Sequence, residues 1–302
     1  MKRVINFMGV RHLAFAVTVL LTLVSLGSLA IKGLNFGLDF TGGTLIELSY
    51  EQPVALDQVR EQLSRSGFDS AVVQSFGATT DVLVRMPGDD PLLGEKIAGA
   101  LRGDGAAGEL TVKRVEFVGP AVGEELRDQG GLGMLLALGG ILVYVAFRFQ
   151  WKFGCGAVLS LFHDVILVLG VFSFFEIPFD LTVLAAVLAV IGYSLNDTIV
   201  VFDRIRENFR LLRKAELLEN INISTTQTLL RTLATSISTL LAVAALMFFG
   251  GENLWGFSLA LMVGVGAGTY SSVYIASILL LWLKLTRDDL IPPVVEEVDE
   301  RP

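Results

Sequence analysis

The sequence predicts an α-helical membrane protein with six transmembrane helices and one small α+β domain outside the membrane. Three observations lead to this fold class. First, 53% of the 302 residues are hydrophobic and only 18% are charged, whereas soluble domains contain about 25% charged residues. Second, uncharged runs recur that are long enough to cross a hydrocarbon core of ~30 Å. Third, one polar segment, 32–129, carries 16 Asp and Glu against 9 Lys and Arg and accounts for most of the net charge of −8.

The first span is predicted at 13–31, an uncharged run behind a basic start, so that residues 1–31 form the N-terminal segment and the first helix. The small residues Ser28 and Ala30 leave a cleaved signal peptide as an alternative. The apolar core of a signal peptide, however, has only about 7–15 residues. We therefore expect a permanent span.

The segment 32–129 is predicted to be a ferredoxin-like domain, because its alternating and amphipathic stretches follow the order βαββαβ. The expected strands are 44–50, 70–76, 81–86 and 110–118, and the expected helices are 55–66 and 91–101. Each helix has one apolar face, made by Leu56, Val59 and Leu63 and by Leu93, Ile97 and Leu101. Both faces should pack on the same side of the sheet. A short helix at 124–129 is expected to lead into the second span.

The remaining spans follow from long apolar runs that contain at most one acidic residue. They are predicted at about 130–147, 153–175, 181–202, 227–249 and 257–283, with an amphipathic helix at 203–220 along the inner surface and a tail at 284–302. The segments on the N-terminal side of the membrane hold 13 Lys and Arg, and the two short loops on the other side hold none. Because basic residues favour the cytoplasmic side, both termini are predicted in the cytoplasm and 32–129 outside.

The sequence lacks the residue patterns that usually support metal binding and nucleotide binding. The chain has one cysteine, Cys155, and two histidines, His12 and His163, that lie far apart with no HExxH motif. No phosphate-binding GxxxxGK[ST] or GxGxxG motif is present. We expect no enzymatic activity, no metal, no cofactor and no nucleic-acid partner, so any work that the protein does must draw its energy from elsewhere.

Two charged residues fall at similar depth within predicted spans. Asp197 lies near the cytoplasmic end of the fourth span, one turn after Ser194, and Arg231 lies near the start of the fifth. A charge at the centre of a membrane helix costs ~2.5–3.5 kcal/mol, so such residues usually face a partner or a water path. We expect Asp197 and Arg231 to act as a pair. The alternatives are a carboxylate that reaches interfacial water and an arginine that snorkels to the headgroups.

Other polar residues extend these two positions. Thr228, Arg231, Thr235 and Ser238 recur at helical spacing and predict one polar stripe on the fifth span. Asp164, within the third span beside His163, is a further ionisable candidate. Adjacent residues on a helix point ~100° apart, which argues against an interacting pair of His163 and Asp164.

Three segments are similar in amino-acid sequence to members of the SecD/SecF family, which belongs to the resistance-nodulation-division superfamily. The first contains the family motif residues Gly37, Asp39, Phe40, Thr41, Gly42 and Gly43. The second is Val118-Gly119-Pro120 followed by Gly123-Glu124-Glu125-Leu126, and the third is the 193–208 stretch YSLNDTIVVFDRIREN. The third segment, followed by Thr228-Leu229-Leu230-Arg231-Thr232, resembles the SecF branch rather than the SecD branch.

This resemblance implies an accessory subunit of the Sec preprotein translocase in the bacterial plasma membrane. Such a subunit works with SecD beside the SecYEG channel, within membrane lipid, and uses the proton-motive force to draw preproteins outward. The family's proton-relay positions fall on Asp197 and Arg231, with Asn196 and Thr198 as neighbours. The residues alone add Ser194 and Asp164 as supporting positions, independently of the resemblance.

Two other classes of function remain open from the residues alone. An efflux or lipid-transport half of the same superfamily would share the topology, although a domain of about 95 residues is small for a drug or lipid cavity. A membrane scaffold without transport activity would use Asp197 and Arg231 as a structural ion pair.

Overall fold

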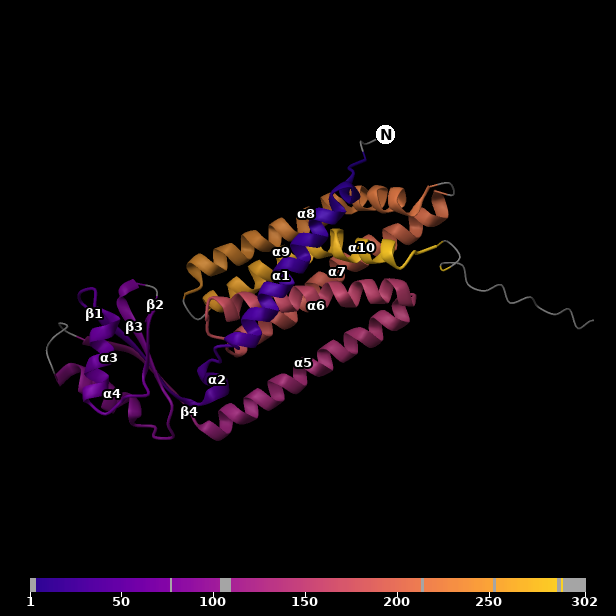
Figure 1. Cartoon of the computed structure of the whole chain (residues 1–302). Coiled ribbons are helices and arrows are strands. Elements are labelled where there is room, and N and C mark those ends of the chain that lie inside the picture. Colours follow the sequence, from indigo (N-terminus) through magenta and orange to yellow (C-terminus); the bar gives the residue numbers. More distant parts are fainter. Residues whose placement is uncertain are drawn as a thin grey trace, which may run out of the picture.

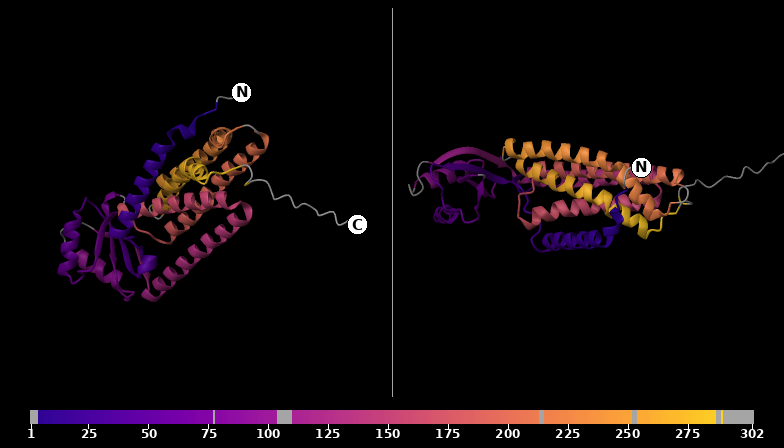
Figure 2. Two further views of the ribbon diagram at one scale, coloured as in Figure 1. Left: turned by 45° about the vertical axis from the view of Figure 1, so that its right-hand side comes forward. Right: turned by 90° about the horizontal axis from the view of Figure 1, so that it is seen from above.

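The computed structural model describes residues 4–76, 78–103, 110–212, 215–251, 254–286 and 289. In this part of the chain, helices form a bundle and a four-stranded sheet domain lies at one end of it (Figure 1). The described N-terminal residues lie at the opposite end of the bundle, as all the views in Figures 1 and 2 show. The predicted fold class is therefore confirmed.

Six helical segments of the described chain are long and apolar enough to cross a membrane. They are α1 (Arg11–Ile31) behind the short 3-10 turn η1 (Phe7–Val10), α5 (Pro120–Arg148), α6 (Trp151–Phe174), α7 (Leu181–Leu211), α8 (Leu217–Phe249), and α9 (Trp255–Val273) together with α10 (Ile275–Trp282). At least half of the span is buried in α6, α7 and α9–α10, whereas α1, α5 and α8 bury less than a quarter. The first three segments therefore form the centre of the bundle.

The helix α1 belongs to the bundle. Ser28 Oγ lies 2.9 Å from Ser173 Oγ on α6. Gly170 of α6 lies so close to Ser25 that an added Cβ would come within 2.2 Å of it.

Two predicted boundaries are wrong. The expected amphipathic helix at 203–220 does not exist as one element, because α7 continues to Leu211 and α8 begins at Leu217. No glycine or proline lies between 193 and 211, so nothing in the sequence ends the helix at the membrane surface. Ile205 and Phe209 consequently pack inside the bundle rather than on a lipid surface. Likewise, the expected short helix at 124–129 is part of the continuous α5, which begins at Pro120.

The sheet domain has the predicted order βαββαβ. Its elements are β1 (Gly43–Tyr50), α3 (Leu56–Arg65), β2 (Val72–Phe76), β3 (Ala78–Met86), α4 (Leu93–Gly103) and β4 (Leu110–Val118). The strands are antiparallel in the order β2-β3-β1-β4. Residues 104–109, which precede β4, lie outside the described chain, as do residue 77 and most of the 284–302 tail.

Both helices of the sheet domain pack on one face of the sheet, as predicted. The core of the domain contains Val59, Leu63, Leu93, Ile97 and Leu101 from the helices, and Leu56 packs at its edge. Because side chains alternate along a strand, the residues between the core positions of β1 and β3 point to the opposite face. That face is turned toward the end of the bundle.

Candidate functional site

Asp197 lies in α7 and is buried, with 2% of its surface exposed. One carboxylate oxygen, Oδ2, has no hydrogen-bond partner in the described structure. Asp197 follows the first residue of α7 by 16 positions, or roughly 24 Å at 1.5 Å per residue. A buried carboxylate without a full set of donors is costly unless a proton or a nearby cation neutralises it.

Arg231 of α8 is the charged group that acts on Asp197 electrostatically. Within the described residues, however, the two side chains form no ion pair at 4.0 Å or less, and Arg231 is exposed at the surface of the bundle. The structure thus places the two predicted residues on helices that pack against each other, α7 and α8, without an ion pair between them in the described residues.

The four residues predicted to form one polar stripe on α8 are divided between an exposed and a buried face of the helix. Arg231, Thr235 and Ser238 are exposed, whereas Thr228 is buried. A second row of hydroxyl residues turns into the bundle at Thr225, Thr228, Thr232 and Ser236. Of this row, Ser236 contacts Thr269 of α9 at 2.7 Å and accepts a hydrogen bond from Tyr193 Oη of α7 at 3.3 Å. Hydroxyl groups therefore connect three helices near Asp197.

The neighbours of Asp197 have different surroundings. Thr198 is buried and Asn196 is exposed, because successive residues of a helix point in different directions. Ser194, one turn before Asp197, is buried and donates to Asp164 Oδ2 at 2.5 Å. The supporting residues that we predicted are thus split between the interior and the surface.

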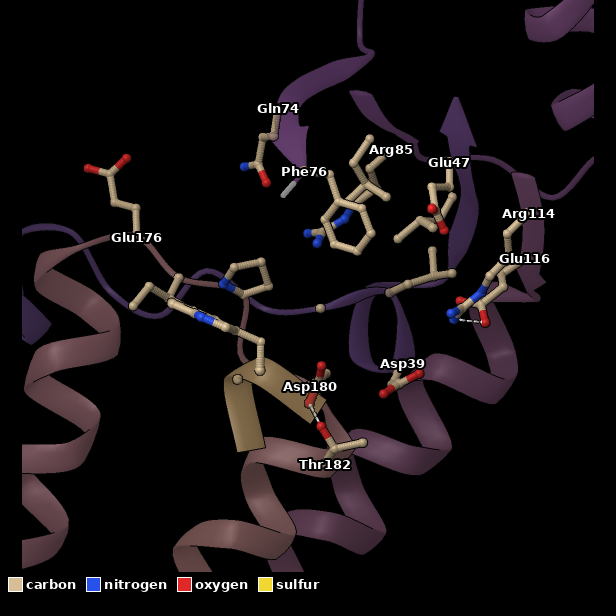
Figure 3. A pocket seen from close by; sticks show the side chains of 18 of the residues that line it. Asp39, Glu47, Gln74, Phe76, Arg85, Arg114, Glu116, Glu176, Asp180 and Thr182 are labelled. Atoms are coloured by element: carbon tan, nitrogen blue, oxygen red, sulfur yellow. Dashed lines mark hydrogen bonds and ion pairs between the residues drawn. The ribbon is translucent and has the colours of Figure 1, made fainter. Parts of the chain in front are cut away.

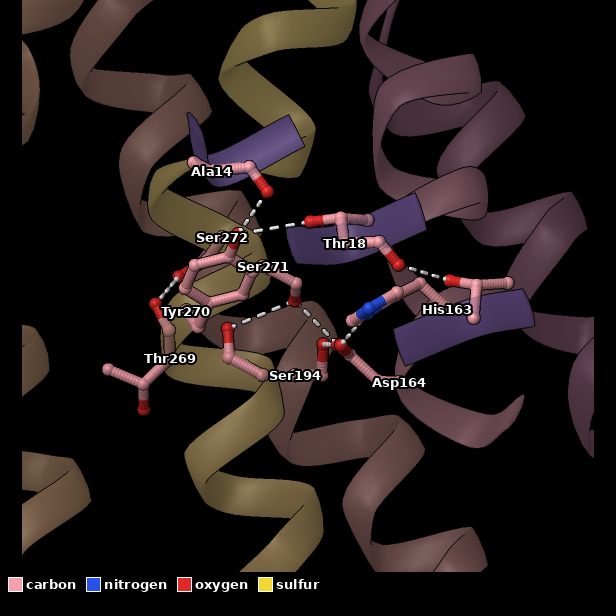
Figure 4. A network of polar contacts seen from close by, with 11 residues as sticks. Ala14, Thr18, His163, Asp164, Ser194, Thr269, Tyr270, Ser271 and Ser272 are labelled. Carbon is pink, nitrogen blue, oxygen red and sulfur yellow. Dashed lines mark hydrogen bonds and ion pairs between the residues drawn. The ribbon is translucent and has the colours of Figure 1, made fainter. Parts of the chain in front are cut away.

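Asp164 is fully buried and joins three helices (Figure 4). Its Oδ2 accepts hydrogen bonds from Ser194 of α7 at 2.5 Å and from Ser271 of α9 at 2.6 Å. Its Oδ1 lies 3.0 Å from Nδ1 of His163. The sequence argument against an interacting pair of His163 and Asp164 is therefore wrong: although the Cβ directions diverge, the side chains bend toward each other. Ser271 was not predicted, because nothing in its sequence neighbourhood distinguishes it from Ser272.

The motif at 37–43 joins the sheet domain to the bundle. The backbone N–H of Gly37 donates to the carbonyl of Phe179 at 2.7 Å. The N–H of Leu181, the first residue of α7, donates to Asp39 Oδ2 at 3.0 Å. Gly42 has a φ of +66°, and a Cβ on it would lie 2.7 Å from Pro120 Cα. The motif thus brings the start of β1, the start of α5 and the start of α7 together.

A cleft of about 910 Å³ separates the open face of the sheet from the end of the bundle (Figure 3). Arg85 of β3 lies on its sheet side, and Asp39 and Asp180 lie on its bundle side. Arg85 Nη1 donates to the carbonyl of Phe36 at 2.8 Å. Burial lowers the pKa of Arg85, and the carboxylates of Asp180 and Asp39 oppose that shift. None of the residues that line this cleft belongs to the intramembrane group around Asp197.

The architecture and the buried carboxylates define a class: a multi-pass membrane protein whose ionisable residues lie inside a helix bundle, with a ferredoxin-like domain fixed to one end of it. Two family models match the chain. "Protein export membrane protein SecD/SecF, C-terminal" covers residues 101–286, and "SecD/SecF GG Motif" covers residues 27–54. The chain belongs to the SecD/SecF family, on its SecF side.

Individual relatives agree with this assignment. The chain is 70% identical to "Protein translocase subunit SecF" of Pseudomonas aeruginosa, over 99% of this chain and 98% of that one. It is 50% identical to the subunit of the same name from Vibrio alginolyticus, over 100% and 98%. The crystal structure of the translocon-associated SecDF of Thermus thermophilus superposes with a TM-score of 0.85 at 42% identity, over 94% of this chain and 39% of that one.

Proposed function

We propose that Asp197 takes up and releases a proton during protein export, the process in which this SecF subunit of the Sec translocase is involved. One observation carries the proposal. Asp197 is buried, one of its oxygens lacks a partner, and the nearby cation, Arg231, acts on it without contact. A carboxylate in this position can exchange a proton without first breaking an ion pair.

Two opposing effects set the protonation of Asp197. Burial disfavours the carboxylate, and a neighbouring guanidinium favours it. A small change in the position of Arg231, or in the water around it, therefore changes the balance. A modest shift of α8 relative to α7 is enough to move Arg231 relative to Asp197. We infer that proton flow drives this shift.

The helix α7 is suited to carry this event to the sheet domain. Asp197 and Leu181 lie on the same continuous helix, and Leu181 is hydrogen-bonded to Asp39 of the motif that begins the sheet domain. A displacement of α7 along its axis would therefore reach the domain through two hydrogen bonds, Leu181 N–H to Asp39 Oδ2 and Gly37 N–H to the carbonyl of Phe179. We infer that the motif transmits motion between the two parts.

A membrane partner fits the exposed polar face of α8. Arg231, Thr235 and Ser238 would be unfavourable against lipid. SecD is the expected partner, since the Thermus thermophilus relative that matches 93% of this chain over 39% of its own length is named SecDF. The SecYEG channel and the translocating preprotein would complete the assembly in the inner membrane, with both termini in the cytoplasm and the sheet domain outside.

The scaffold alternative is less well supported. It requires a structural ion pair between Asp197 and Arg231, and no such pair is formed in the described residues. The efflux alternative gains no support from the relatives reported above, which are translocase subunits by name.

The test is preprotein translocation into inverted membrane vesicles with and without a proton gradient. Asp197→Asn should reduce gradient-stimulated export to the level without a gradient and leave SecD binding intact. The matched control is Asp203→Asn, which removes a half-buried carboxylate from the same helix that pairs with Arg148 and Arg206. If Asp197→Asn keeps gradient stimulation, the proton-relay proposal is wrong. If it loses SecD in a pull-down instead, the scaffold alternative replaces it.

A further inference from the structure

Asp164 was predicted as a supporting residue of the relay, but the relay proposed above gives it no step. It is 0% exposed, in the centre of the bundle, and the side chains of Ser194, Ser271 and His163 converge on it (Figure 4). Three directed contacts show that this carboxyl group is held in one orientation. A buried carboxylate with this many partners is a built site rather than a residue left over in an apolar helix.

The contacts define the roles of the hydrogen atoms. An ionised carboxylate can only accept hydrogen bonds, so in the ionised state of Asp164 the two serine hydroxyls and Nδ1 of His163 are the donors. That leaves Nε2 as the atom at which the His163 ring gains or loses a proton. Nε2 is buried and has no hydrogen-bond partner in the described structure, and His163 as a whole is only 6% exposed.

The elements packed against this pair supply no counter-charge for Asp164. The helices α9 and α10 contain no charged residue. The charged residues of α1, α5 and α6 other than Asp164 lie at the helix ends, and those of α7 other than Asp197 lie at its far end. The titratable groups on all these elements are Arg11 and His12 of α1; Glu124, Glu125, Arg127, Asp128, Tyr144 and Arg148 of α5; Lys152 and Cys155 of α6; Tyr193, Asp197, Asp203, Arg204, Arg206, Glu207 and Arg210 of α7; Tyr270 of α9; and Tyr274 between α9 and α10.

We propose that His163 and Asp164 form a second proton-binding site, connected to Asp197 through Ser194. A proton that binds at Nε2 of His163 converts a neutral imidazole and a carboxylate, with a net charge of −1, into an imidazolium–carboxylate pair with a net charge of zero. Loss of the same proton restores the first state, and no other bond changes. A buried net charge is expensive in a bundle centre, and the protonated pair carries none.

The link to Asp197 is short. Ser194 donates to Asp164 and lies three residues before Asp197, on the same side of α7. The strength of the hydrogen bond from Ser194 to Asp164 depends on the negative charge of the Asp164 carboxylate. A proton on His163 compensates that charge and so changes this hydrogen bond. The proton on His163 thus influences α7 one turn from the relay carboxylate. This coupling rests on the proposed function, whereas the binding of a proton by His163 does not.

The direct test exploits the small number of histidines. With His12→Gln, His163 is the only histidine in the chain, so the full-length protein, labelled with ¹⁵N-histidine and purified without a histidine tag, gives signals from this ring alone. In lipid nanodiscs, we expect the ¹⁵N shifts to change from neutral imidazole to imidazolium as the pH falls from 9 to 5. Asp164→Asn should reduce the ratio of imidazolium to neutral ring at a given pH by at least about tenfold. A ring that stays neutral throughout this range overturns the proposal, and so does one whose ratio is unchanged by Asp164→Asn.

Since Asp164→Asn can weaken the fold, Ser271→Ala provides a second variant. It removes one of three donors to Asp164 and should therefore increase the imidazolium fraction of His163, because the remaining carboxylate charge is less well compensated. Ser160→Ala is the matched control, since its buried hydroxyl has no partner on the same helix or elsewhere in the described structure. A decreased imidazolium fraction in Ser271→Ala, or an equal change in Ser160→Ala, would contradict the proposal.

The coupling to export is tested with His163→Asn, whose amide nitrogen takes the place of Nδ1, so that it keeps a donor to Asp164 but cannot titrate. Gradient-stimulated export should become less dependent on pH between 6 and 8 than in the parent, while SecD binding is unchanged. An unaltered pH profile removes the link to Asp197. If Asp197→Asn exports normally but His163 still titrates with Asp164, the relay fails and the second site stands.

Discussion

The Oδ2 atom of Asp39 lies 3.0 Å from the backbone nitrogen of Leu181, the first residue of α7. Asp180, the residue before it, caps the same helix by accepting from the N–H of Val183 at 2.8 Å. Two carboxylates therefore satisfy two of the first free N–H groups of α7, those of Leu181 and Val183, and face the positive end of its dipole. One of them comes from the motif that leads into the sheet domain, which ties that domain to the helix that carries Asp197.

Replacing Asp39 should weaken this connection between the sheet domain and α7. Asp39→Ala removes one N-terminal hydrogen bond, which costs ~0.5–2 kcal/mol for helix caps in general, and leaves the cap by Asp180 in place. We expect the protein to remain folded and to bind SecD, but to lose at least half of its gradient-stimulated export. The control is Asp57→Ala, which removes an exposed carboxylate in the first turn of α3. Equal export by Asp39→Ala and Asp57→Ala would mean that the contact transmits nothing.

A glycine in the same motif should tolerate no side chain. Gly42 has a φ of +66°, and an added Cβ would lie 2.7 Å from Pro120 Cα, so both the conformation and the space favour glycine. Gly42→Ala should lower the yield of folded protein several-fold. Gly131→Ala in α5, where an added Cβ meets nothing within 4 Å, should leave the yield unchanged. Membrane-extracted protein measured by gel filtration decides between the two outcomes.

The elements of this protein are largely predictable, because their signals are local. Apolar runs give the six spans, and the period of two in 44–50 and 110–118 gives strands that the structure has at β1 and β4. Helix ends are less predictable at the membrane surface, since hydropathy marks where a helix enters water but not where it stops. For that reason α7 runs nine residues past 202, to Leu211.

The site is only partly predictable. Asp197 and Arg231 are conspicuous as charges in apolar surroundings, but their distance and the exposure of Arg231 depend on how α7 and α8 pack. The contacts of Asp164 with Ser271 and of Arg85 with Phe36 join residues more than 45 positions apart. Spacing along one helix carries no information about such pairs.

Alkaline pH should destabilise the sheet domain through Tyr50. Its ring is 4% exposed, its hydroxyl has no hydrogen-bond partner, and burial raises the pKa of Tyr50 to about 12. The unfolded chain ionises near 10, so the folded domain holds this proton more tightly. Stability is therefore constant with respect to this group below pH 10 and falls as the pH rises from about 10 to 12, by at most roughly 2.7 kcal/mol.

Tyr50→Phe should remove this fall in stability, because phenylalanine cannot ionise and brings no unpaired hydroxyl into the core. The measurement is pulse proteolysis of the sheet domain of the full chain, in nanodiscs, across a urea series at pH 8 and pH 11. Parent and Tyr50→Phe proteins that lose equal stability between these two pH values would show that another group is responsible.

Topology can be tested with single cysteines. In a Cys155→Ser background, Arg210→Cys places a thiol at an exposed position near the end of α7, and Glu51→Cys places one at an exposed position after β1. With both termini in the cytoplasm, an impermeant thiol reagent added to intact cells should label position 51 and not position 210. In inverted vesicles the pattern should be reversed. Labelling of position 210 from outside would refute the proposed orientation.

The last prediction concerns how Arg231 acts on Asp197. Since no ion pair joins the two side chains in the described structure, the influence of Arg231 is that of a nearby positive charge rather than of a bidentate contact. Arg231→Lys keeps the charge and loses the planar fork, so it should retain at least half of the gradient-stimulated export. Arg231→Leu removes the charge and should reduce stimulation to that of Asp197→Asn.

The matched control is Arg210→Leu, which removes an exposed arginine at the end of α7 and should leave stimulation unchanged. The comparison that matters is between lysine and leucine at position 231, measured in the same vesicles at the same gradient. If lysine fails as completely as leucine while SecD binding persists, the guanidinium must contact the carboxylate directly at some stage of the cycle. In that case, Asp197 exchanges its proton by opening and closing an ion pair, and the conformation described here is its open state.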